Sequence, residues 1–207
     1  MFVALVNGSP HPQGCTYTAL MEVAKSLKAN GIDSKIYDIG LDVKGSCRGC
    51  GGCKASGKCV IDDAVNRFIP VAQASNGFVF GSPVHYAAPC GDILSFMSRL
   101  SFCAGRYLAN KPAASVVSCR RGGATGALDT MNKFYPINGM PMVPSQYWNM
   151  VHGNKPEDVL QDAEGLQIMR NLGLKMAWFL KCINESKALG IPAPILDEPR
   201  QMTNFIR

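Results

Sequence analysis

The sequence predicts an α/β fold with a doubly wound, five-stranded parallel sheet in the order 2-1-3-4-5. Short apolar segments alternate along the chain with longer segments of helical periodicity, as they do in parallel sheets with helices on both faces. The first segment, 2–6, is continuously apolar, which is typical of a strand that is buried on both sides. A loop rich in Gly, Pro, Ser and Thr follows it at 8–18 and leads into a helical pattern.

The remaining elements follow from apolar spacing and from start and stop signals. Strands are predicted at 1–7, 34–39, 77–81, 112–118 and 140–143. Helices are predicted at 16–30, 62–72, 89–100 and 125–134, with two more beginning near 156 and 164. We expect one domain over 1–207, with a Cys-rich loop at 45–60 and a helical C-terminal extension at 156–207.

Composition argues against several functional classes. Hydrophobic residues make up 47% of the 207 residues and charged residues 17%, which is ordinary for a globular protein. The net charge is +6, but the Lys and Arg residues are scattered, so no nucleic-acid partner is expected. Neither a membrane-spanning run nor a signal peptide is evident, so we predict a cytoplasmic protein without a membrane partner. In a reducing compartment, nine Cys are more often metal ligands, catalytic groups or inert thiols than disulfides.

The loop at 8–18 has the composition of an anion site. Ser9, Thr16 and Thr18 offer hydroxyl donors, while Gly8 and Gly14 allow the backbone to approach a ligand closely. The loop has neither the Gly-Lys-Ser/Thr of a Walker A motif nor the glycine spacing of a dinucleotide loop. A monophosphate site of the flavodoxin type is therefore favoured, and an ordinary strand-to-helix turn with a Thr N-cap is the alternative.

A second loop, at 81–90, is predicted at the same edge of the sheet. In a doubly wound sheet, ligands bind at the carboxyl ends of the strands, beside the point where the strand order switches. His85 or Tyr86 could pack against the ring of a flat ligand there. The alternative is a turn stopped by Pro83, with His85 at the surface.

The third loop of this edge lies at 118–124. Arg120 and Arg121 could meet a phosphate or a flavin oxygen, and the alternative is a pair of solvent-exposed arginines beside a glycine turn. Cys119 has no evident partner base, so we expect a small buried hydrophobe and not a nucleophile.

Four cysteines with the spacing C-x2-C-x2-C-x5-C form the sharpest local signal. They are Cys47, Cys50, Cys53 and Cys59, on a loop that also carries Arg48, Lys54 and Lys58. Two-residue gaps are typical of iron–sulfur ligation, and nearby cations would offset the negative charge of a cluster. Zinc, which more often uses two separated Cys pairs, and four free thiols are the alternatives.

Taken together, these motifs resemble the NAD(P)H-dependent FMN reductases of the flavodoxin-like fold, in particular the iron–sulfur flavoproteins. The resemblance rests on Gly8-Ser9-Pro10 with Thr16, on the four cysteines followed by Asp62-Asp63, and on Gly81-Ser82-Pro83-Val84. The segments Gln146–Asn149 and Thr203–Arg207 also resemble this branch.

The resemblance implies a flavodoxin-like FMN-binding domain that holds FMN non-covalently. The FMN phosphate would contact Ser9, His11, Gly14, Cys15, Thr16 and Thr18. The isoalloxazine ring would lie between Pro83, Val84, His85 and Tyr86 on one side and Ser118, Cys119, Arg120, Gly122 and Gly123 on the other. A 4Fe–4S cluster would be held by Cys47, Cys50, Cys53 and Cys59. The chain departs from the family at His11, where Arg is common, and at His85, where Tyr is common.

The implied function is an FMN-dependent oxidoreductase with NAD(P)H as co-substrate. Electrons would pass to a quinone, a nitro or azo compound, a free flavin or the cluster. The alternative is an electron carrier between redox partner proteins without direct NAD(P)H oxidation, and a redox- or metal-sensing protein is a third hypothesis. No catalytic acid or base is predicted, because the cofactor carries the reaction. Such proteins are commonly homodimers or homotetramers, in which Tyr147 or Trp148 could reach a neighbour's flavin.

Overall fold

The computed structural model describes residues 1–196, 198–199 and 201–203. Five parallel strands lie in the order β2-β1-β3-β5-β6, and β4 pairs antiparallel with β3 outside this path. The strands are β1 (Phe2–Asn7), β2 (Asp33–Asp38), β3 (Gly77–His85), β4 (Ala88–Pro89), β5 (Ala113–Cys119) and β6 (Met150–His152). Counted over the parallel strands alone, this is the predicted order 2-1-3-4-5, and the predicted fold class is confirmed.

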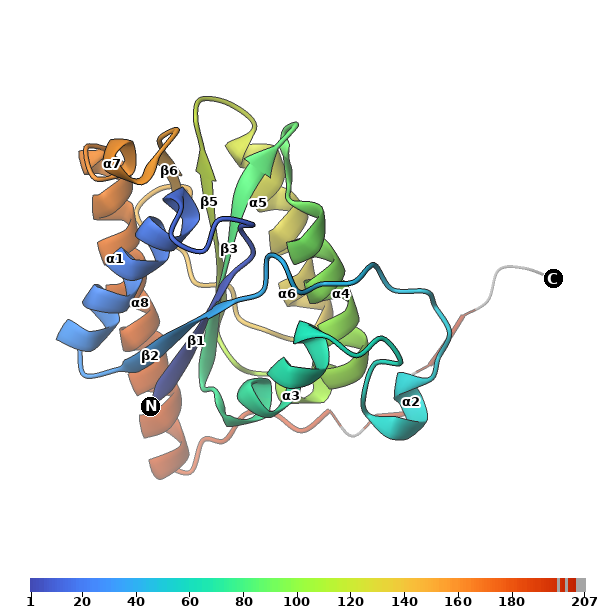
Figure 1. The fold of residues 1–207 in the computed structure, drawn as a ribbon. Helices are drawn as coiled ribbons and strands as arrows, with labels where there is room; N and C mark the ends of the chain where they lie inside the picture. Colours follow the sequence, from blue (N-terminus) through green and yellow to red (C-terminus); the bar gives the residue numbers. More distant parts are fainter. Residues whose placement is uncertain (197, 200, 204–207) are drawn as a thin grey trace.

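Helices cover both faces of the sheet (Figure 1). One face carries α1 (Cys15–Ala29) and α8 (Ala163–Ala188), and the other carries α3 (Ala64–Ala74), α4 (Gly91–Ala104) and α5 (Ala124–Asn132). The short helices are α2 (Cys53–Ser56), α6 (Phe134–Ile137), α7 (Pro156–Val159) and a 3₁₀ turn at Gly105–Tyr107.

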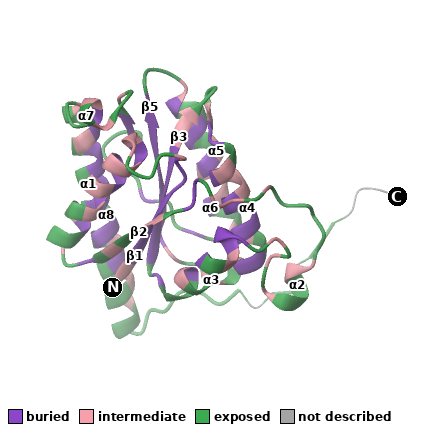
Figure 2. Cartoon of the chain, viewed as in Figure 1, coloured by how far each residue is buried: buried purple, intermediate pink, exposed green. Residues whose placement is uncertain are grey.

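The central strand β1 explains the continuous apolar run at the start of the chain. Its side chains alternate, so that Val3 and Leu5 pack toward α1 and α8, while Ala4 and Val6 pack toward α3 and α4. The sheet is therefore buried on both faces. The Cys-rich loop projects away from the sheet and is largely exposed (Figure 2).

Two helix boundaries, the end of α1 and the start of α3, follow the sequence signals closely. Gly31 has φ +77° just after α1, which is the left-handed conformation that glycine adopts without strain. Asp63 is the N-cap of α3, and its side chain accepts a hydrogen bond from the backbone N–H of Val65.

The predicted strand at 140–143 is wrong. Only an isolated bridge between Ala113 and Met142 occurs there, and the fifth parallel strand is β6, inside a segment that was expected to be a loop. The two backbone hydrogen bonds around the bridge, Ala113 N–H to Pro141 and Val143 N–H to Ala113, make the segment extended without making it a strand. A strand of three residues has no periodicity that a sequence pattern could show.

Other boundaries also differ from expectation. β3 runs on through Pro83 to His85 and turns into β4, so α4 begins at Gly91 and not at Pro89. The helix predicted at 125–134 divides into α5 and α6, and the Cys-rich loop contains the short helix α2. Residues 204–207 of the family-like C-terminal segment lie outside the described residues. In the part of the chain that the structure describes, no helix has the length and apolarity needed to cross a bilayer.

Candidate functional site

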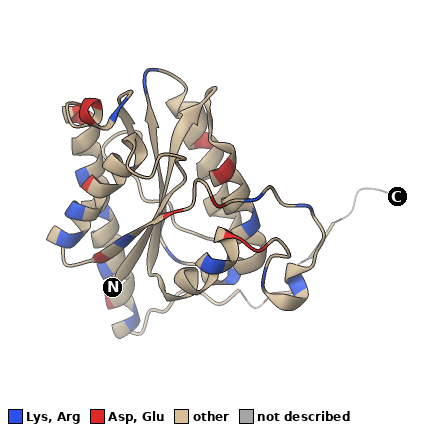
Figure 3. Ribbon diagram, in the orientation of Figure 1, with Lys and Arg blue, Asp and Glu red and all other residues tan. Residues whose placement is uncertain are grey.

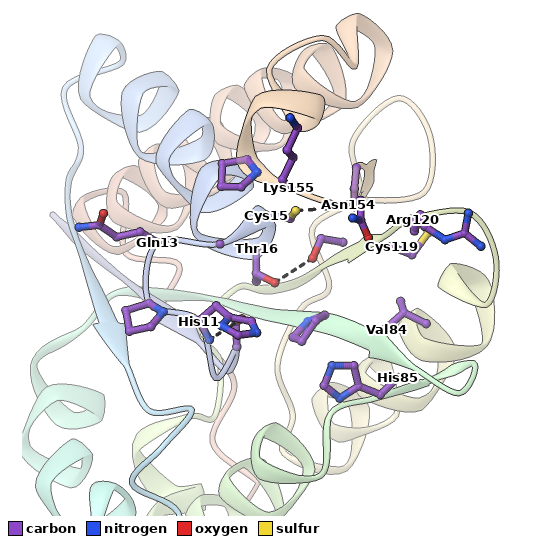
Figure 4. Close-up of a pocket in the computed structure, with 17 residues that line it drawn as sticks. His11, Gln13, Cys15, Thr16, Val84, His85, Cys119, Arg120, Asn154 and Lys155 are labelled. Atoms are coloured by element: carbon purple, nitrogen blue, oxygen red, sulfur yellow. Dashed lines mark hydrogen bonds between the residues drawn. The ribbon is translucent and has the colours of Figure 1, made fainter.

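A cavity of about 540 Å³ opens at the carboxyl ends of the parallel strands (Figure 4). It is lined by the loop after β1, the end of β3, the end of β5 and the segment after β6. The structure brings most of the predicted site residues to this cavity. They are Ser9, His11, Gly14, Cys15, Thr16, Pro83, Val84, His85, Ser118, Cys119 and Arg120.

Four predicted site residues, Thr18, Tyr86, Gly122 and Gly123, lie outside the lining of this cavity. The Thr18 hydroxyl donates to the carbonyl of Gly14 within α1, at 3.2 Å. Tyr86 is fully exposed at the tip of the β3–β4 hairpin. Gly123, with φ +86°, lies beneath that tip, because a Cβ at this position would be 2.6 Å from the Cα of Ala87.

The segment after β6 contributes lining residues that were not predicted. They are Gly153, Asn154, Lys155 and Pro156. The Cys15 thiol donates to the carbonyl of Gly153 at 3.6 Å, so the segment lies directly against the start of α1. The sequence predicts that its Gly-Asn pair ends a loop, because the strand before the pair, β6, has only three residues and shows no period. A correctly placed β6 would have put this segment at the same sheet edge.

The loop after β1 is fixed by the strands on either side of it. Its Gly8 N–H donates to the carbonyl of Gly81 in β3 at 2.9 Å. The N–H of Ser9 donates to Oδ1 of Asn7 at 3.2 Å, and Nδ2 of Asn7 donates to Asp38 in β2 at 2.7 Å. The loop is thus held from both neighbouring strands, and its conformation is set before any ligand binds.

The N-terminus of α1 is open toward the cavity. Its N-cap is Gly14, and none of the described residues caps it with a side chain or places a carboxylate in its first turn. Thr16 and Thr18 lie inside the helix, so the alternative of a Thr N-cap is wrong. The first N–H groups of a helix have no partner within it, and with the helix dipole they attract anions.

Hydroxyl groups from a helix and a strand meet beside this helix end. The Oγ1 of Thr16 and the Oγ of Ser118 are 2.9 Å apart and share a hydrogen bond, drawn dashed in Figure 4. Both residues are buried, and they come from α1 and β5. The Oγ of Ser9 accepts a hydrogen bond from the N–H of His11 at 3.1 Å. Ser9, Thr16 and Ser118 therefore supply hydroxyls along one wall of the cavity.

The charges around the cavity favour an anionic ligand. Arg120 and Lys155 line it together with His11 and His85, and none of its described lining residues is Asp or Glu. Figure 3 shows Lys and Arg on the loop after β5 and beside α7, at the same end of the sheet as the acidic residues Glu157 and Asp158 of α7. A cavity with an apolar wall that also offers cations, hydroxyls and an open helix N-terminus fits a phosphate-bearing cofactor.

The thiols in the cavity wall are not nucleophiles. Burial raises the pKa of Cys15, and the charges of Asp158 and Glu157 raise it further. Burial likewise raises the pKa of Cys119, which is only 5% exposed, as expected of a small buried hydrophobe. Both side chains are therefore neutral thiols at neutral pH.

The four cysteines of the Cys-rich loop line a second cavity, of about 400 Å³. Cys47 and Cys50 are exposed, and Cys53 and Cys59 are half-buried. Within the described residues, no three Cys, His, Asp or Glu side chains are arranged as a metal site. The donor set nevertheless fits an iron–sulfur cluster chemically, because four thiols of one short loop face one cavity.

Helix α4 brings three more residues to the second cavity, Arg99, Phe102 and Cys103, which the sequence does not single out. Cys103 is buried, and burial together with the neighbouring Cys53 and Cys59 raises its pKa to about 12. Arg99 is completely buried and forms a two-pronged ion pair with Asp63. No pattern in the sequence links α4 to the cysteines, because Arg99 is 40 residues from Cys59.

The ion pair lowers the pKa of Asp63. Burial alone would raise it, but hydrogen bonds from Arg99 and from the backbone N–H groups of Lys44 and Val65 outweigh burial. Asp63 is therefore an anion that caps α3, anchors the start of the Cys-rich loop and balances a buried guanidinium.

Comparison with known proteins identifies the family to which the chain belongs. The family described as NADPH-dependent FMN reductase matches residues 1–155 of the chain. An iron–sulfur flavoprotein of Methanocaldococcus jannaschii is 30% identical over 193 residues, which are 89% of this chain and 100% of that protein. An iron–sulfur flavoprotein of Methanosarcina thermophila is 24% identical over 90% of this chain and 99% of its own length.

Solved structures show the same fold at low sequence identity. RosB with the bound intermediate 8-demethyl-8-formylriboflavin-5'-phosphate has a TM-score of 0.74 at 11% identity, over 100% of this chain and 92% of that one. A flavodoxin from the domain Archaea has a TM-score of 0.59 at 14% identity, over 87% of this chain and 99% of its own.

Proposed function

Because the chain belongs to the NADPH-dependent FMN reductase family, we propose that it is an FMN-dependent oxidoreductase that takes hydride from NAD(P)H. Electrons would pass to a quinone, a nitro or azo compound, a free flavin or an iron–sulfur cluster. The observation that carries the proposal is the cavity of about 540 Å³ at the switch point of the sheet, with an open helix N-terminus.

The residues of this cavity divide into two groups by chemistry. The first-turn N–H groups of α1 and the hydroxyls of Ser9 and Thr16 would bind the phosphate of FMN. Val84 and His85 on one side and Ser118–Arg120 on the other would hold the flavin ring. Bound FMN supplies hydride acceptance and one-electron transfer, and the protein orients it and tunes its electronics. Arg120 and Lys155 would favour the ring or phosphate in its anionic form.

We further propose that Cys47, Cys50, Cys53 and Cys59 hold a 4Fe–4S cluster. The proposal is supported by their common cavity and by relatives that carry the name iron–sulfur flavoprotein. Thiolate ligands to such a cluster carry negative charge, which Arg48 and Lys54 around the same cavity would offset.

A second candidate function is an electron carrier that exchanges single electrons with redox partner proteins and does not oxidise NAD(P)H directly. It is favoured by the exposure of Cys47 and Cys50, which would bring a cluster within reach of a docked protein.

One anaerobic preparation tests the cofactors. We expect flavin absorption bands, about one FMN per chain, and iron and sulfide in amounts that match a four-iron cluster. If the purified protein shows no flavin bands and binds no FMN on titration, the proposed oxidoreductase function is wrong. A Cys50→Ser variant with unchanged iron content would exclude the proposed cluster ligands.

Anaerobic mixing with NADH and with NADPH separates the two candidate functions. A reductase bleaches its flavin absorbance rapidly with at least one of the two nucleotides. Failure to bleach at a useful rate, in a protein that does contain FMN, would favour the electron carrier. The predicted homodimer or homotetramer would be checked by sedimentation of the same preparation.

A further inference from the structure

We propose that Arg99 is a positioning residue for the cysteine cluster site, which it serves through a hydrogen bond from its Nε–H to the sulfur of Cys59. The consequence is a raised reduction potential for the cluster. The inference rests on the proposed 4Fe–4S cluster and goes beyond it, because it assigns a function to a buried charge on α4.

The guanidinium of Arg99 uses all five of its N–H donors. Nη1 donates to Asp63 at 2.6 Å and to the carbonyl of Gly45 at 3.2 Å. Nη2 donates to Asp63 at 2.9 Å and to the carbonyl of Ile61 at 2.7 Å. Nε donates to the Sγ of Cys59 at 3.2 Å. The four N–H groups of Nη1 and Nη2 thus donate to oxygen acceptors. Because the guanidinium is planar, these bonds orient the fifth N–H group, on Nε, toward the sulfur of Cys59.

These contacts tie together both ends of the Cys-rich loop. Gly45 stands just before Cys47, and Ile61 stands just after Cys59. Asp63 accepts hydrogen bonds from Lys44 at the loop start and from Val65 in α3, so it cannot turn away from Arg99. The position of the guanidinium is therefore set by the fold and not by a metal.

A buried hydrogen-bond donor to a cluster ligand changes the energy of the reduced state. The side chains of Arg99 and Asp63 are both 0% exposed and Cys59 is half-buried, so water screens the contact between Arg99 and Cys59 only in part. A cluster becomes more negative when it takes an electron, and hydrogen bonds to its sulfurs favour that state. Asp63 balances the net charge of Arg99, so the directed N–H donor at the sulfur carries the effect.

Isotope labelling tests the contact in the unaltered protein. Protein grown with arginine labelled with ¹⁵N at Nε would be purified anaerobically, reduced with dithionite and examined by pulsed EPR. We expect a ¹⁵N coupling to the reduced cluster that persists in Arg48→Lys, which removes the arginine of the Cys motif. A coupling that is absent, or that disappears in Arg48→Lys, would overturn the proposal.

Substitution of Arg99 tests the predicted rise in the reduction potential of the cluster. Arg99→Lys keeps the positive charge but has only three donors in place of the five of the planar guanidinium. It therefore cannot donate hydrogen bonds to Asp63, to both carbonyls and to the sulfur at the same time. We expect the ratio of reduced to oxidised cluster at a fixed potential to fall about tenfold, which is ~59 mV for one electron. The matched control is Arg106→Lys, because Arg106 is exposed near the same loop and is not among the donors to Cys59.

Iron and sulfide analysis distinguishes a failure of the proposed cluster from a failure of the inference about Arg99. A wild-type protein without a cluster contradicts the proposed cofactor, and the inference about Arg99 falls with it. A wild-type protein with a cluster, but with the same potential in Arg99→Lys as in Arg106→Lys, contradicts the inference alone. If Arg99→Lys does not fold, the ¹⁵N coupling in the wild-type protein decides.

Discussion

At the scale of single residues, Asp63 has partners that a neutral side chain would not satisfy. It pairs with the buried Arg99 and also accepts hydrogen bonds from Lys44 and Val65. Removing one partner of a buried ion pair leaves an uncompensated charge, which costs more than the net contribution of the pair itself. We therefore expect Asp63→Asn to destabilise the protein by about 3–5 kcal/mol.

Chemical denaturation of the two variants Asp63→Asn and Asp62→Asn measures this effect. Asp62 is the matched control, because it is exposed and its side chain accepts one hydrogen bond, from Asn66. The control should change stability by less than about 0.5 kcal/mol. Equal losses in the two variants would show that the buried pair contributes little.

The lowered pKa of Asp63 also predicts how stability depends on pH. Its contribution is fully present above the pKa of the unfolded chain, about 3.9, and is lost as pH falls through the lower pKa of the folded state. Between those two values the unfolded state binds the extra proton, so acid favours unfolding. The free energy of unfolding should fall more steeply below about pH 4 in the wild type than in Asp63→Asn, and parallel curves would contradict the assignment.

His11 is the residue of the phosphate loop with the clearest consequence for binding. It is exposed at the cavity wall, and its backbone N–H donates to Ser9. A permanently charged guanidinium there would pair with a phosphate across partly exposed space, which is worth up to about 1 kcal/mol. His11→Arg should therefore lower the Kd for FMN by about two- to fivefold in a fluorescence titration.

The control for this substitution is His152→Arg. It adds the same charge beside Asp162, at a residue that does not line the cavity. Unchanged FMN affinity in His11→Arg, or an equal gain in both variants, would mean that position 11 does not contact the phosphate.

At the scale of elements, the turn after β2 sets the position of the phosphate loop. A Cβ on Gly40 would lie 2.0 Å from the carbonyl oxygen of Ser9 and 2.9 Å from the backbone N of Pro10. Backbone atoms cannot rotate away as a flexible side chain can, so Gly40→Ala must displace the loop. We expect at least a tenfold loss of FMN affinity together with a destabilisation of about 1–3 kcal/mol.

FMN titration and thermal unfolding of Gly40→Ala would be compared with Gly91→Ala. A Cβ on Gly91 meets no atom of the described structure within 4 Å, and neither glycine has a positive φ. The control should therefore bind FMN normally. Normal binding by Gly40→Ala as well would show that the loop position does not control the affinity.

The sequence predicts those elements whose residue pattern lies within a short stretch of the chain. The three loops that meet at the cavity were predicted because Gly, Pro and Ser follow apolar strands, and parallel strands bring their carboxyl ends together. β6 was missed because Met150, Val151 and His152 are too few to show a period. The cavity residues after it, including Lys155, were missed with it.

Arg99 was missed for a different reason. Its partners Gly45, Cys59 and Asp63 are 54, 40 and 36 residues away, and the fold alone brings them together. Within α4 it lies between Ser98 and Leu100, where a sequence pattern gives no reason to expect a fully buried charge. Asp63 was recognised only as an N-cap, since that function depends on neighbouring residues.

At the scale of the whole molecule, α8 completes one of the two helical layers. The family match ends at residue 155, before this helix begins. Yet α8 buries Ile168, Met169, Leu172, Met176 and Leu180 against α1 and the sheet. Close packing at Gly173, where a Cβ would lie 2.6 Å from the Cβ of Ser26, brings α8 directly onto α1. The helical part of the predicted extension is therefore integral to the core.

Truncation separates α8 from the tail that follows it. Each large side chain in the core contributes about 1.5–3 kcal/mol, and a whole domain is stable by only about 5–15 kcal/mol. A chain that ends at residue 155 loses six of them, Val159 of α7 and the five of α8, and uncovers the apolar face of α1, so it should show no cooperative thermal transition by circular dichroism. A chain that ends at residue 190 keeps α8 and loses a segment whose described residues are exposed, so it should unfold cooperatively near the wild-type temperature. Cooperative unfolding of the 1–155 chain would show that the family-matched segment folds without α8. The layer that contains α8 would then not be needed for folding.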